Sequence, residues 1–416
     1  MRVDWDETVP SLCPDCQPPL VEGVARLTAM AFAGAGTAAL LDHIAHSGSR
    51  AAAYGHDAAI AHQLGFRRAE GLALQDGALD AGTVFRVRPH AAQPAPLRLL
   101  ALLAPGDLMV NTPLDFLTEH LNVRLDLLYL DAERALPARI PDHDVAFCAV
   151  SEAAPALLAR LGALCDRWPR PLVNHPRGLP ALARDVLPGV LAGVPGLCSP
   201  PAAMATRAAL LAHLADHAPM SRLLPGAEYP LLVRPGGSHA GHDLARIEDD
   251  AALAEYLRLS AARLLCLTAF VDYRAADGLF RKYRIAFVAG VPHLCHMAVS
   301  EHWMVHYLNA GMTGSAGKRA QEAAAMAGFD DGFARRHRTA LAELAARLGF
   351  DLFSIDCGET ADGRLLVFEA DTGAILHLMD PPDPFAYKQA PMRRMFAAFG
   401  EMLRSHRHGP HLTRSH

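Results

Sequence analysis

Hydrophobic positions along the chain follow three successive patterns. Between residues 20 and 88 they recur at helical spacing, as at Leu20, Val24 and Leu27, so this stretch is predicted to be helical. From residue 97 on, apolar runs alternate with amphipathic segments, and the runs cover residues 97–103, 123–130 and 144–150. Apolar strands that alternate with helices predict a small parallel sheet covered on both faces.

The third pattern begins near residue 200 and indicates antiparallel strands joined by tight turns. Strands are expected at residues 229–234, 244–247, 264–273, 281–289, 291–300, 350–358 and 364–370. Helices are expected at residues 202–217, 248–259, 329–348 and 389–404. The fold class is therefore α/β followed by α+β.

These changes of pattern divide the chain into five parts. We expect a helical N-terminal region, a small α/β domain, two α+β subdomains and a disordered, His-rich tail. Their boundaries are placed at residues 1–95, 96–200, 201–275, 276–404 and 405–416.

Composition narrows the function classes. The chain has 416 residues, of which 51% are hydrophobic and 20% charged, so it can bury a sizeable core. Its net charge of −5 argues against a general nucleic-acid binder, which would carry a basic excess. Lysine is scarce: it occurs only at Lys282, Lys318 and Lys388, and arginine supplies the remaining basic charge.

The N-terminal segment carries acidic residues and no apolar stretch of the kind a signal peptide needs. The apolar run over residues 27–44 is short and rich in small residues, so no membrane span is expected and a cytoplasmic location is predicted. Cys13 and Cys16 have a metal-like spacing, but a zinc site needs two more ligands and no second pair follows. The alternative is a surface turn.

Three carboxylates in the C-terminal part of the chain are candidate functional residues. Asp356 and Glu369 lie among apolar residues of two predicted strands, and Asp371 follows two residues later. Carboxylates in buried strands are costly unless they are paired or bind a cation. Oxygen ligands from adjacent strands suit Mg²⁺, and a half-exposed hairpin is the simpler alternative.

Two basic motifs precede these carboxylates. Arg234 begins a glycine-rich loop, Arg-Pro-Gly-Gly-Ser-His-Ala-Gly-His, whose backbone amides suit a phosphate, although glycine also serves ordinary turns. In the strand Arg281-Lys-Tyr-Arg284, Lys282 and Arg284 share one face and Arg281 and Tyr283 the other. Two adjacent cations indicate an anionic ligand or nearby carboxylates, or else a protected sheet edge.

In this order, the motifs resemble the ATP-grasp superfamily, most closely its branch of glutathione synthetase, D-alanine–D-alanine ligase and RimK-type ligases. Residues 229–238 resemble the phosphate-binding strand and loop, residues 267–272 the hinge strand beside adenine, and residues 281–290 the strand that follows. The spacing of the carboxylates, thirteen residues and then two, resembles the magnesium triad. The resemblance covers about residues 97–404, and residues 20–88 resemble a helical-repeat segment.

The resemblance implies ATP and Mg²⁺ as cofactors and assigns roles to residues. Phosphates would be held by Arg207, Arg234, Gly236, Gly237 and Ser238, the nucleoside by Phe270, Val271 and Asp272, the γ-phosphate and the substrate carboxylate by Lys282 and Arg284, and Mg²⁺ by Asp356, Glu369 and Asp371. Arg234 and Arg207 stand where the family usually has lysine, and Asp371 stands where it usually has asparagine.

The resemblance implies an ATP-dependent carboxylate–amine ligase that forms an acyl phosphate and releases ADP and phosphate. Two alternatives stay open: an ATP-grasp phosphotransferase, and a nucleotide-binding scaffold without turnover. Candidate substrate residues are His302, Lys318 and Arg319, which have solvated or packing roles as alternatives. The expected substrates are small molecules or peptides; no nucleic-acid or membrane partner is expected, and a homodimer is left open.

Overall fold

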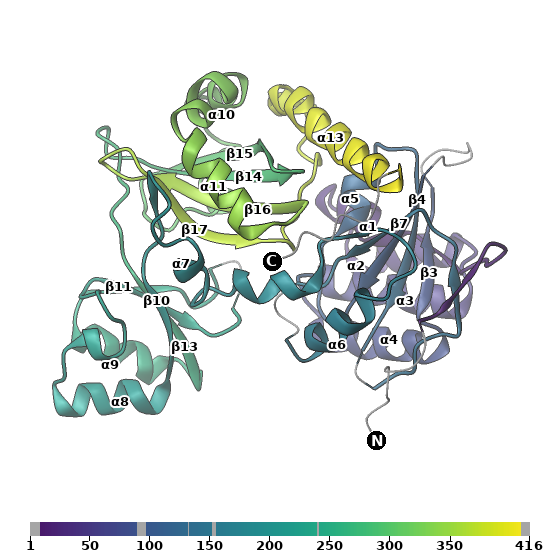
Figure 1. The fold of residues 1–416 in the computed structure, drawn as a ribbon, viewed down its shortest axis with the longest axis horizontal. Helices are drawn as coiled ribbons and strands as arrows, with labels where there is room; N and C mark the ends of the chain where they lie inside the picture. Colours follow the sequence, from purple (N-terminus) through teal and green to yellow (C-terminus); the bar gives the residue numbers. More distant parts are fainter. Residues whose placement is uncertain (1–8, 90–96, 132, 152–154, 239–240, 409–416) are drawn as a thin grey trace.

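The structure is a computed structural model that describes residues 9–89, 97–131, 133–151, 155–238 and 241–408. Two bodies lie side by side in Figure 1, one built on a mostly parallel sheet and the other on two sheets that are antiparallel except for the pair β17–β9. The long last helix, α13 (Gln389–His408), runs between them. Within the described part of the chain, the helices are all too short or too polar to cross a bilayer.

The first body contains a six-stranded sheet in the order β2-β3-β5-β4-β7-β8. Its strands are β2 (Leu20–Val21), β3 (Val84–Val87), β4 (Leu97–Leu103), β5 (Val123–Tyr129), β7 (Val145–Cys148) and β8 (Leu172–Val173). All neighbours are parallel except β3 and β5. The central strand β4 is buried at six of its seven residues, which explains why five of them are leucine and confirms the predicted parallel sheet.

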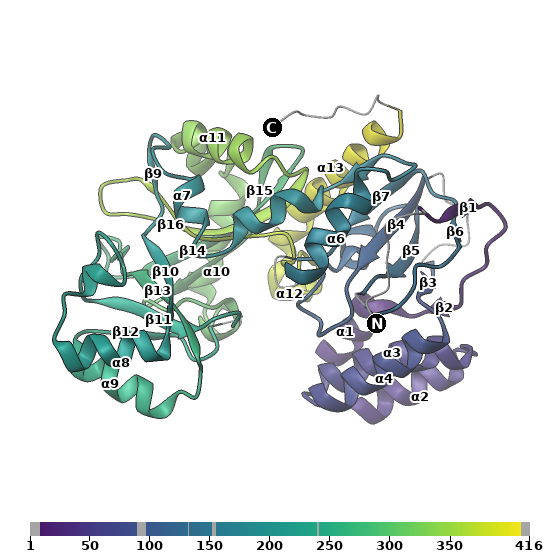
Figure 2. The same cartoon turned by 60° about the horizontal axis from the view of Figure 1, so that its bottom comes forward.

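The N-terminal region is helical, but it also completes this sheet through β2 and β3. Its helices are α1 (Gly23–Phe32), α2 (Thr37–His46), α3 (Ala51–Leu64) and α4 (Arg68–Ala81), and they gather beneath the sheet in Figure 2. The backbone N–H of Ala25 donates to the buried Asp115 of α5 (Leu114–Thr118) at 2.7 Å. Because a buried carboxylate caps α1 from the neighbouring unit, the helices are an integral part of the first body.

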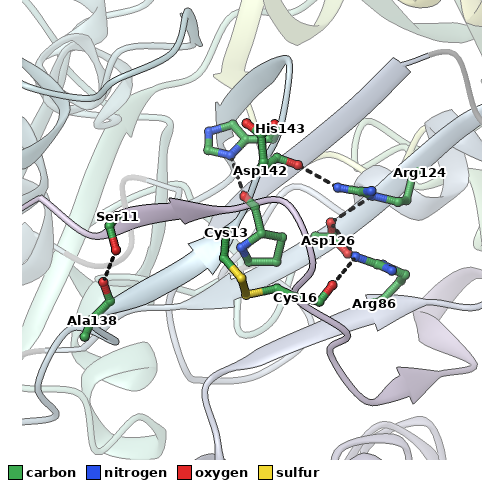
Figure 3. Close-up of a disulfide and its surroundings, with 10 residues drawn as sticks. Ser11, Cys13, Cys16, Arg86, Arg124, Asp126, Ala138, Asp142 and His143 are labelled. Carbon is green, nitrogen blue, oxygen red and sulfur yellow. Dashed lines mark hydrogen bonds and ion pairs between the residues drawn. A yellow bond between two sulfur atoms is a disulfide. The ribbon is translucent and has the colours of Figure 1, made fainter.

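Cys13 and Cys16 form a disulfide in the turn after β1 (Ser11–Cys13), which pairs with β6 (Arg139–Pro141). Figure 3 shows the disulfide close to Arg86, whose guanidinium forms an ion pair with Asp126. Neither sulfur is available as a thiolate for a metal, so the metal alternative is wrong in this structure and the turn alternative is confirmed.

The second body begins with a four-stranded antiparallel sheet in the order β10-β13-β11-β12. Its strands are β10 (Ala202–Thr206), β11 (Leu231–Pro235), β12 (Ala245–Ile247) and β13 (Leu264–Ala269), and α8 (Arg207–Asp216) and α9 (Asp250–Leu259) cover one face. The predicted helix over 202–217 is wrong in its first five residues, which form β10. Pairing with β13 outweighs the helix propensity of alanine there, and Thr206 Oγ1 caps the helix by accepting from Ala209 N at 3.1 Å.

A five-stranded sheet follows, in the order β15-β14-β16-β17-β9. Its strands are β9 (Leu197–Cys198), β14 (Phe280–Val288), β15 (Val291–Ser300), β16 (Leu352–Glu359) and β17 (Leu365–Asp371). Helices α10 (Ala316–Ala327) and α11 (Arg338–Leu348) pack against it. Aromatic rings fill this core, with Phe287 and Phe353 stacked at a centroid separation of 4.5 Å.

Two expectations about the later helices need correction. Helix α10 lies where no helix was expected; it is rich in alanine, and of its side chains only those of Glu322 and Met326 are buried, so few large apolar residues mark it in the sequence. Helix α13 extends to His408, so residues 405–408 belong to a helix and not to a disordered tail. Residues 409–416 lie outside the described residues.

Helix α13 joins the two bodies. Phe396 and Phe399 are fully buried in one cluster that includes Phe147 of the parallel sheet and Val288 of β14. The rings of Phe147 and Phe399 meet edge-on at 6.2 Å. This apolar seam fixes how the bodies face each other and therefore shapes the space between them.

We predict that Phe399→Ala lowers the free energy of unfolding by about 3–5 kcal/mol, because it leaves a cavity in this seam. Phe66→Ala is the matched control, since Phe66 is 98% exposed, and it should change stability by less than about 0.5 kcal/mol. Urea unfolding followed by circular dichroism measures both. Equal effects of the two substitutions would contradict the seam.

Candidate active site

A cavity of about 1000 Å³ lies between the four-stranded sheet, the five-stranded sheet and the segment that follows β17. Residues from α1 also reach it, including Phe32. Nine charged side chains line it: Arg184, Arg234, Lys282, Arg284, Asp356, Glu369, Asp371, Asp380 and Lys388. Their number is high for a buried space, so the cavity is the candidate active site.

The three predicted carboxylates lie on one face of the β16–β17 hairpin. Asp356 and Glu369 are cross-strand partners, and Asp371 pairs with Ser354 two residues along. Because side chains on a strand alternate, Glu369 and Asp371 share a face with Asp356. Asp356 is only 3% exposed, so the alternative of a solvent-facing hairpin is wrong for this residue.

Lys282 and Arg284 lie on the same face of β14, as their alternation predicts, and both bind Asp356. Lys282 Nζ donates to Asp356 Oδ2 at 2.7 Å, while Arg284 Nε and Nη2 donate to Oδ1 and Oδ2 at 2.8 and 2.9 Å. Burial acts to raise the pKa of Asp356, but these two cations outweigh it and hold the pKa well below its usual range. Asp356 is therefore ionised.

Glu369 and Asp371 have different surroundings. Arg184 Nη2 donates to Glu369 Oε2 at 2.8 Å, and this cation helps to lower the pKa of Glu369 against the effect of burial. Burial, and then the charge of Glu369, raise the pKa of Asp371 to about 6. A cation bound nearby would therefore favour the ionised form of Asp371.

Arg234 extends from β11 into the cavity and spans its own loop. Its Nε donates to Ser238 Oγ at 2.9 Å and its Nη2 to the Ser238 carbonyl at 2.5 Å. Burial, together with the neighbouring Arg184, lowers the pKa of Arg234 to about 10. Two guanidinium groups near each other in a buried space form a place for an anion.

The glycines of this loop have different reasons for being glycine. Gly237 has φ +74°, where L side chains are strained, and a Cβ on Gly236 would lie 2.7 Å from Met204 Cε. Gly236, Gly237 and Ser238 do not line the cavity, while Gly241 does. His239 and Ala240 lie outside the described residues.

An apolar part of the cavity is lined by Phe270 and Val271, the predicted nucleoside residues. Arg246 lies over the Phe270 ring at 4.2 Å, and Trp303 meets the same ring edge-on at 5.8 Å. The side chain of Asp272 is 54% exposed, lies 3.8 Å from Arg274 and does not line the cavity. Its assignment to the ribose stays a prediction.

Four other predicted residues lie away from the cavity lining: Arg207, His302, Lys318 and Arg319. Arg207 donates to the carbonyls of Ser260 and Leu257 at the end of α9, at 2.7 and 2.5 Å. Lys318 Nζ donates to the Ala310 carbonyl at 2.9 Å, and Arg319 Nη1 to the Met312 carbonyl at 3.0 Å. In this structure these cations support helix ends and loops.

The donor set suits Mg²⁺, because buried carboxylate oxygens at a polar cavity are its preferred protein ligands. Within the part of the chain that the structure describes, however, the acidic, histidine and cysteine side chains nowhere gather as three or more in a geometry ready for a metal. Two of the carboxylates already have cationic partners: Lys282 and Arg284 form ion pairs with Asp356, and Arg184 forms one with Glu369. An ion would have to share or displace these contacts.

Sequence patterns gave no indication of Arg184 or Asp380. Arg184 follows η1 (Pro176–Leu182) in the connection to the second body, and Asp380 lies in an irregular segment after β17. Neither belongs to a periodic element, so neither has a position that a pattern can assign. Lysine scarcity did mark Lys388, which is buried and lines the cavity.

The chain is similar to several solved structures. A RimK domain ATP-grasp protein from Sphaerobacter thermophilus matches with 18% identity over 73% of this chain and 99% of its own, at a TM-score of 0.41. The VanG D-Ala:D-Ser ligase from Enterococcus faecalis matches with 9% identity over 74% and 99%, at 0.47. The ATP-grasp ligase PsnB, complexed with precursor peptide PsnA2 and AMPPNP, matches with 13% identity over 76% and 99%, at 0.39.

Two of these three structures are described as ATP-grasp proteins, and two as ligases. No protein-family model and no curated protein sequence matches the chain. The chemistry of the cavity is therefore derived from the chain's own residues.

The raised pKa of Asp371 makes a prediction about stability. The folded chain keeps this proton up to about pH 6, whereas the unfolded chain loses it near pH 3.8, so unfolding becomes easier as the pH rises between these values. Without Mg²⁺, Asp371→Asn should stabilise the protein by roughly 1–3 kcal/mol at pH 7.5 and by little at pH 4.

Urea unfolding of the wild type and the variant at both pH values measures this difference. Asp362→Asn, in the exposed turn of the same hairpin, is the control and should show no gain at pH 7.5. A gain from Asp371→Asn that is the same at both pH values would contradict the assignment.

Proposed function

We propose that the protein is an ATP-dependent carboxylate–amine ligase that works through an acyl phosphate. The observation that supports this most directly is the face shared by β14, β16 and β17. Three carboxylates and two cations meet there, and Arg184 and Arg234 line the same cavity. Such a site offers ligands for Mg²⁺ and positive charge for phosphates and for a substrate carboxylate.

The residues then divide by role. Arg234, with its loop, would hold nucleotide phosphates, and Phe270 and Val271 would contact the base. Lys282 and Arg284 would neutralise the γ-phosphate and the substrate carboxylate. Arg184, which the sequence did not indicate, would release Glu369 and turn to phosphate. Arg207 keeps its carbonyl partners and is left out of this assignment.

Asp356, Glu369 and Asp371 would hold Mg²⁺, which supplies positive charge between phosphate oxygens. Asp371 differs from the usual asparagine of the resembling family, so a bound ion would meet one more negative charge here. That extra charge fits the raised pKa of Asp371, because a cation nearby would lower it and release the proton.

The chemistry has two steps. An oxygen of the substrate carboxylate bonds to the γ-phosphorus while the bond to ADP breaks, and the acyl phosphate forms. The nitrogen of the amine then bonds to the acyl carbon, phosphate leaves, and the amine gives up a proton. Lys282 and Arg284 stabilise the anionic oxygens in both steps, and the enclosed cavity limits attack by water.

We predict that a screen of carboxylates and amines finds a pair that triggers ATP-dependent ADP release, and that Glu369→Gln lowers this rate at least 100-fold. The substitution removes one negative charge from the proposed metal ligands and keeps the shape of the side chain. Asp362→Asn, in the exposed turn of the same hairpin, is the control and should keep full activity.

A coupled ADP assay, with thermal melts to show that each variant is folded, gives the answer. Normal turnover by Glu369→Gln would contradict the metal assignment. A phosphorylated final product would replace the ligase by a phosphotransferase, and nucleotide binding without any turnover would leave a scaffold.

Lysine scarcity gives a second prediction. Lys282 Nζ lies 2.7 Å from the buried Asp356, beside Arg284, and a guanidinium is larger and forked, so it would not repeat the geometry of this ammonium. Lys282→Arg should therefore reduce kcat at least tenfold although it keeps the charge. Arg281→Lys on the opposite face of β14 is the control and should change kcat less than twofold. Unchanged activity of Lys282→Arg would mean that its scarcity reflects composition alone.

A further inference from the structure

A second polar cluster lines the same cavity, and the proposed chemistry does not use it. Lys388 comes from η5 (Ala386–Lys388), Tyr307 from η3 (Tyr307–Asn309), Glu322 from α10 and Asp380 from the segment after β17. Three of these line the cavity, and Glu322 lies behind them. Because its members come from four separate segments of the chain, this cluster is formed by tertiary folding and not by a local turn.

Glu322 is fully buried and its hydrogen-bonding capacity is used inside the protein. It accepts from the backbone N–H of Met297 at 3.1 Å, from Tyr307 Oη at 2.9 Å and from Tyr387 Oη at 2.6 Å. Lys388 Nζ lies 3.4 Å from its Oε1. Glu322 is thus the internal counter-ion of Lys388, and a ligand in the cavity does not reach it.

Asp380 is the carboxylate that remains. Lys388 Nζ donates to its Oδ2 at 2.8 Å and also to Tyr307 Oη, and lies over the ring of Tyr307 at 4.1 Å. The Asp380 side chain is 21% exposed and faces the cavity, whereas Lys388 is 3% exposed. Because Glu322 already balances Lys388, Asp380 leaves this cluster with one net negative charge.

The two clusters therefore differ in net charge. In the hairpin cluster, four cations face three carboxylates; in the second cluster, Lys388 faces Asp380 and Glu322. His296, His306 and His377 also line the cavity, and burial lowers the pKa of each, so they add no charge at neutral pH. An anion fits the first cluster and a cation the second.

Apolar side chains line the cavity together with Asp380. They include Leu376, Met379, Phe385 and Met392, and the Phe385 ring lies 4.9 Å from Lys388 Nζ. A small inorganic cation would gain nothing from such walls. A cation attached to an apolar body would bury that body while its charge meets Asp380.

We propose that Asp380 binds the ammonium group of a primary amine with an apolar body, and that this is the amine substrate. Lys388 and Glu322 act as positioning residues, because they hold Asp380 at the cavity wall from behind. Only the statement that the amine is a substrate rests on the proposed ligase function. The binding site itself is argued from charge and shape.

The experiment measures binding of phenylalanine amide, which carries an ammonium and an aromatic ring but no carboxylate, to the full-length protein by calorimetry without ATP. The wild type should bind it saturably, and Asp380→Asn should weaken binding at least tenfold. Asp380→Glu should recover binding to within fivefold of the wild type. Asp383→Asn, an exposed aspartate in the same segment, is the control and should stay within twofold.

The neutral analogue 3-phenylpropanamide should bind the wild type at least tenfold more weakly than the amine. Equal affinity of the two probes, equal affinity of wild type and Asp380→Asn, or no saturable binding to the wild type would each overturn the proposal. The calorimetry is done without nucleotide, so it tests the site separately from the ligase reaction. If the amine binds but the substrate screen gives no ADP release, the ligase function is contradicted and this site is kept. If ADP is released but the amine does not bind, only the site is contradicted.

Discussion

The buried Asp356 carboxylate and its two cations constrain the rest of the site. A carboxylate without partners in the middle of a sheet would be protonated or would destabilise the fold. Here Arg284 lies directly across from Asp356 in the register of β14 and β16, and Lys282 lies two residues along on the same face. The register that satisfies this charge also puts Glu369 opposite Asp356 and Asp371 beside it. The metal ligands and the phosphate cations therefore share one structural origin.

The second body alone does not make the cavity. Its far wall comes from the segment after β17 and from η5, and α13 then continues into the seam between the two bodies. The same C-terminal stretch thus carries Asp380 and Lys388 and packs in the seam that joins the two bodies. Positive charge exceeds negative charge around the face of β14, β16 and β17, and one negative charge remains on the C-terminal stretch. A substrate that spans the cavity would be oriented by that difference before any reaction.

The sequence predicted the parts of the site that lie on regular strands. Alternation along residues 281–284 placed Lys282 and Arg284 on one face, and the spacing of Asp356, Glu369 and Asp371 anticipated their common side. The sequence did not predict the site residues that lie outside regular helices and strands, where the hydrophobic pattern has no period. Arg184 and Asp380 reach the cavity from irregular segments, and only tertiary folding brings them there. Alanine-rich stretches misled in both directions, since Ala202–Thr206 forms a strand and Ala316–Ala327 a helix.

A crystal structure with Mg²⁺ and a non-hydrolysable ATP analogue tests the central claim most directly, because the carboxylates and cations are then seen with their proposed ligands. The account predicts Mg²⁺ within about 2.0–2.2 Å of oxygens from Asp356 and Glu369, with Arg184 moved from Glu369 to a phosphate and the base beside Phe270. A nucleotide bound elsewhere, or a metal ion that contacts neither carboxylate while Arg184 keeps its pairing with Glu369, would contradict it.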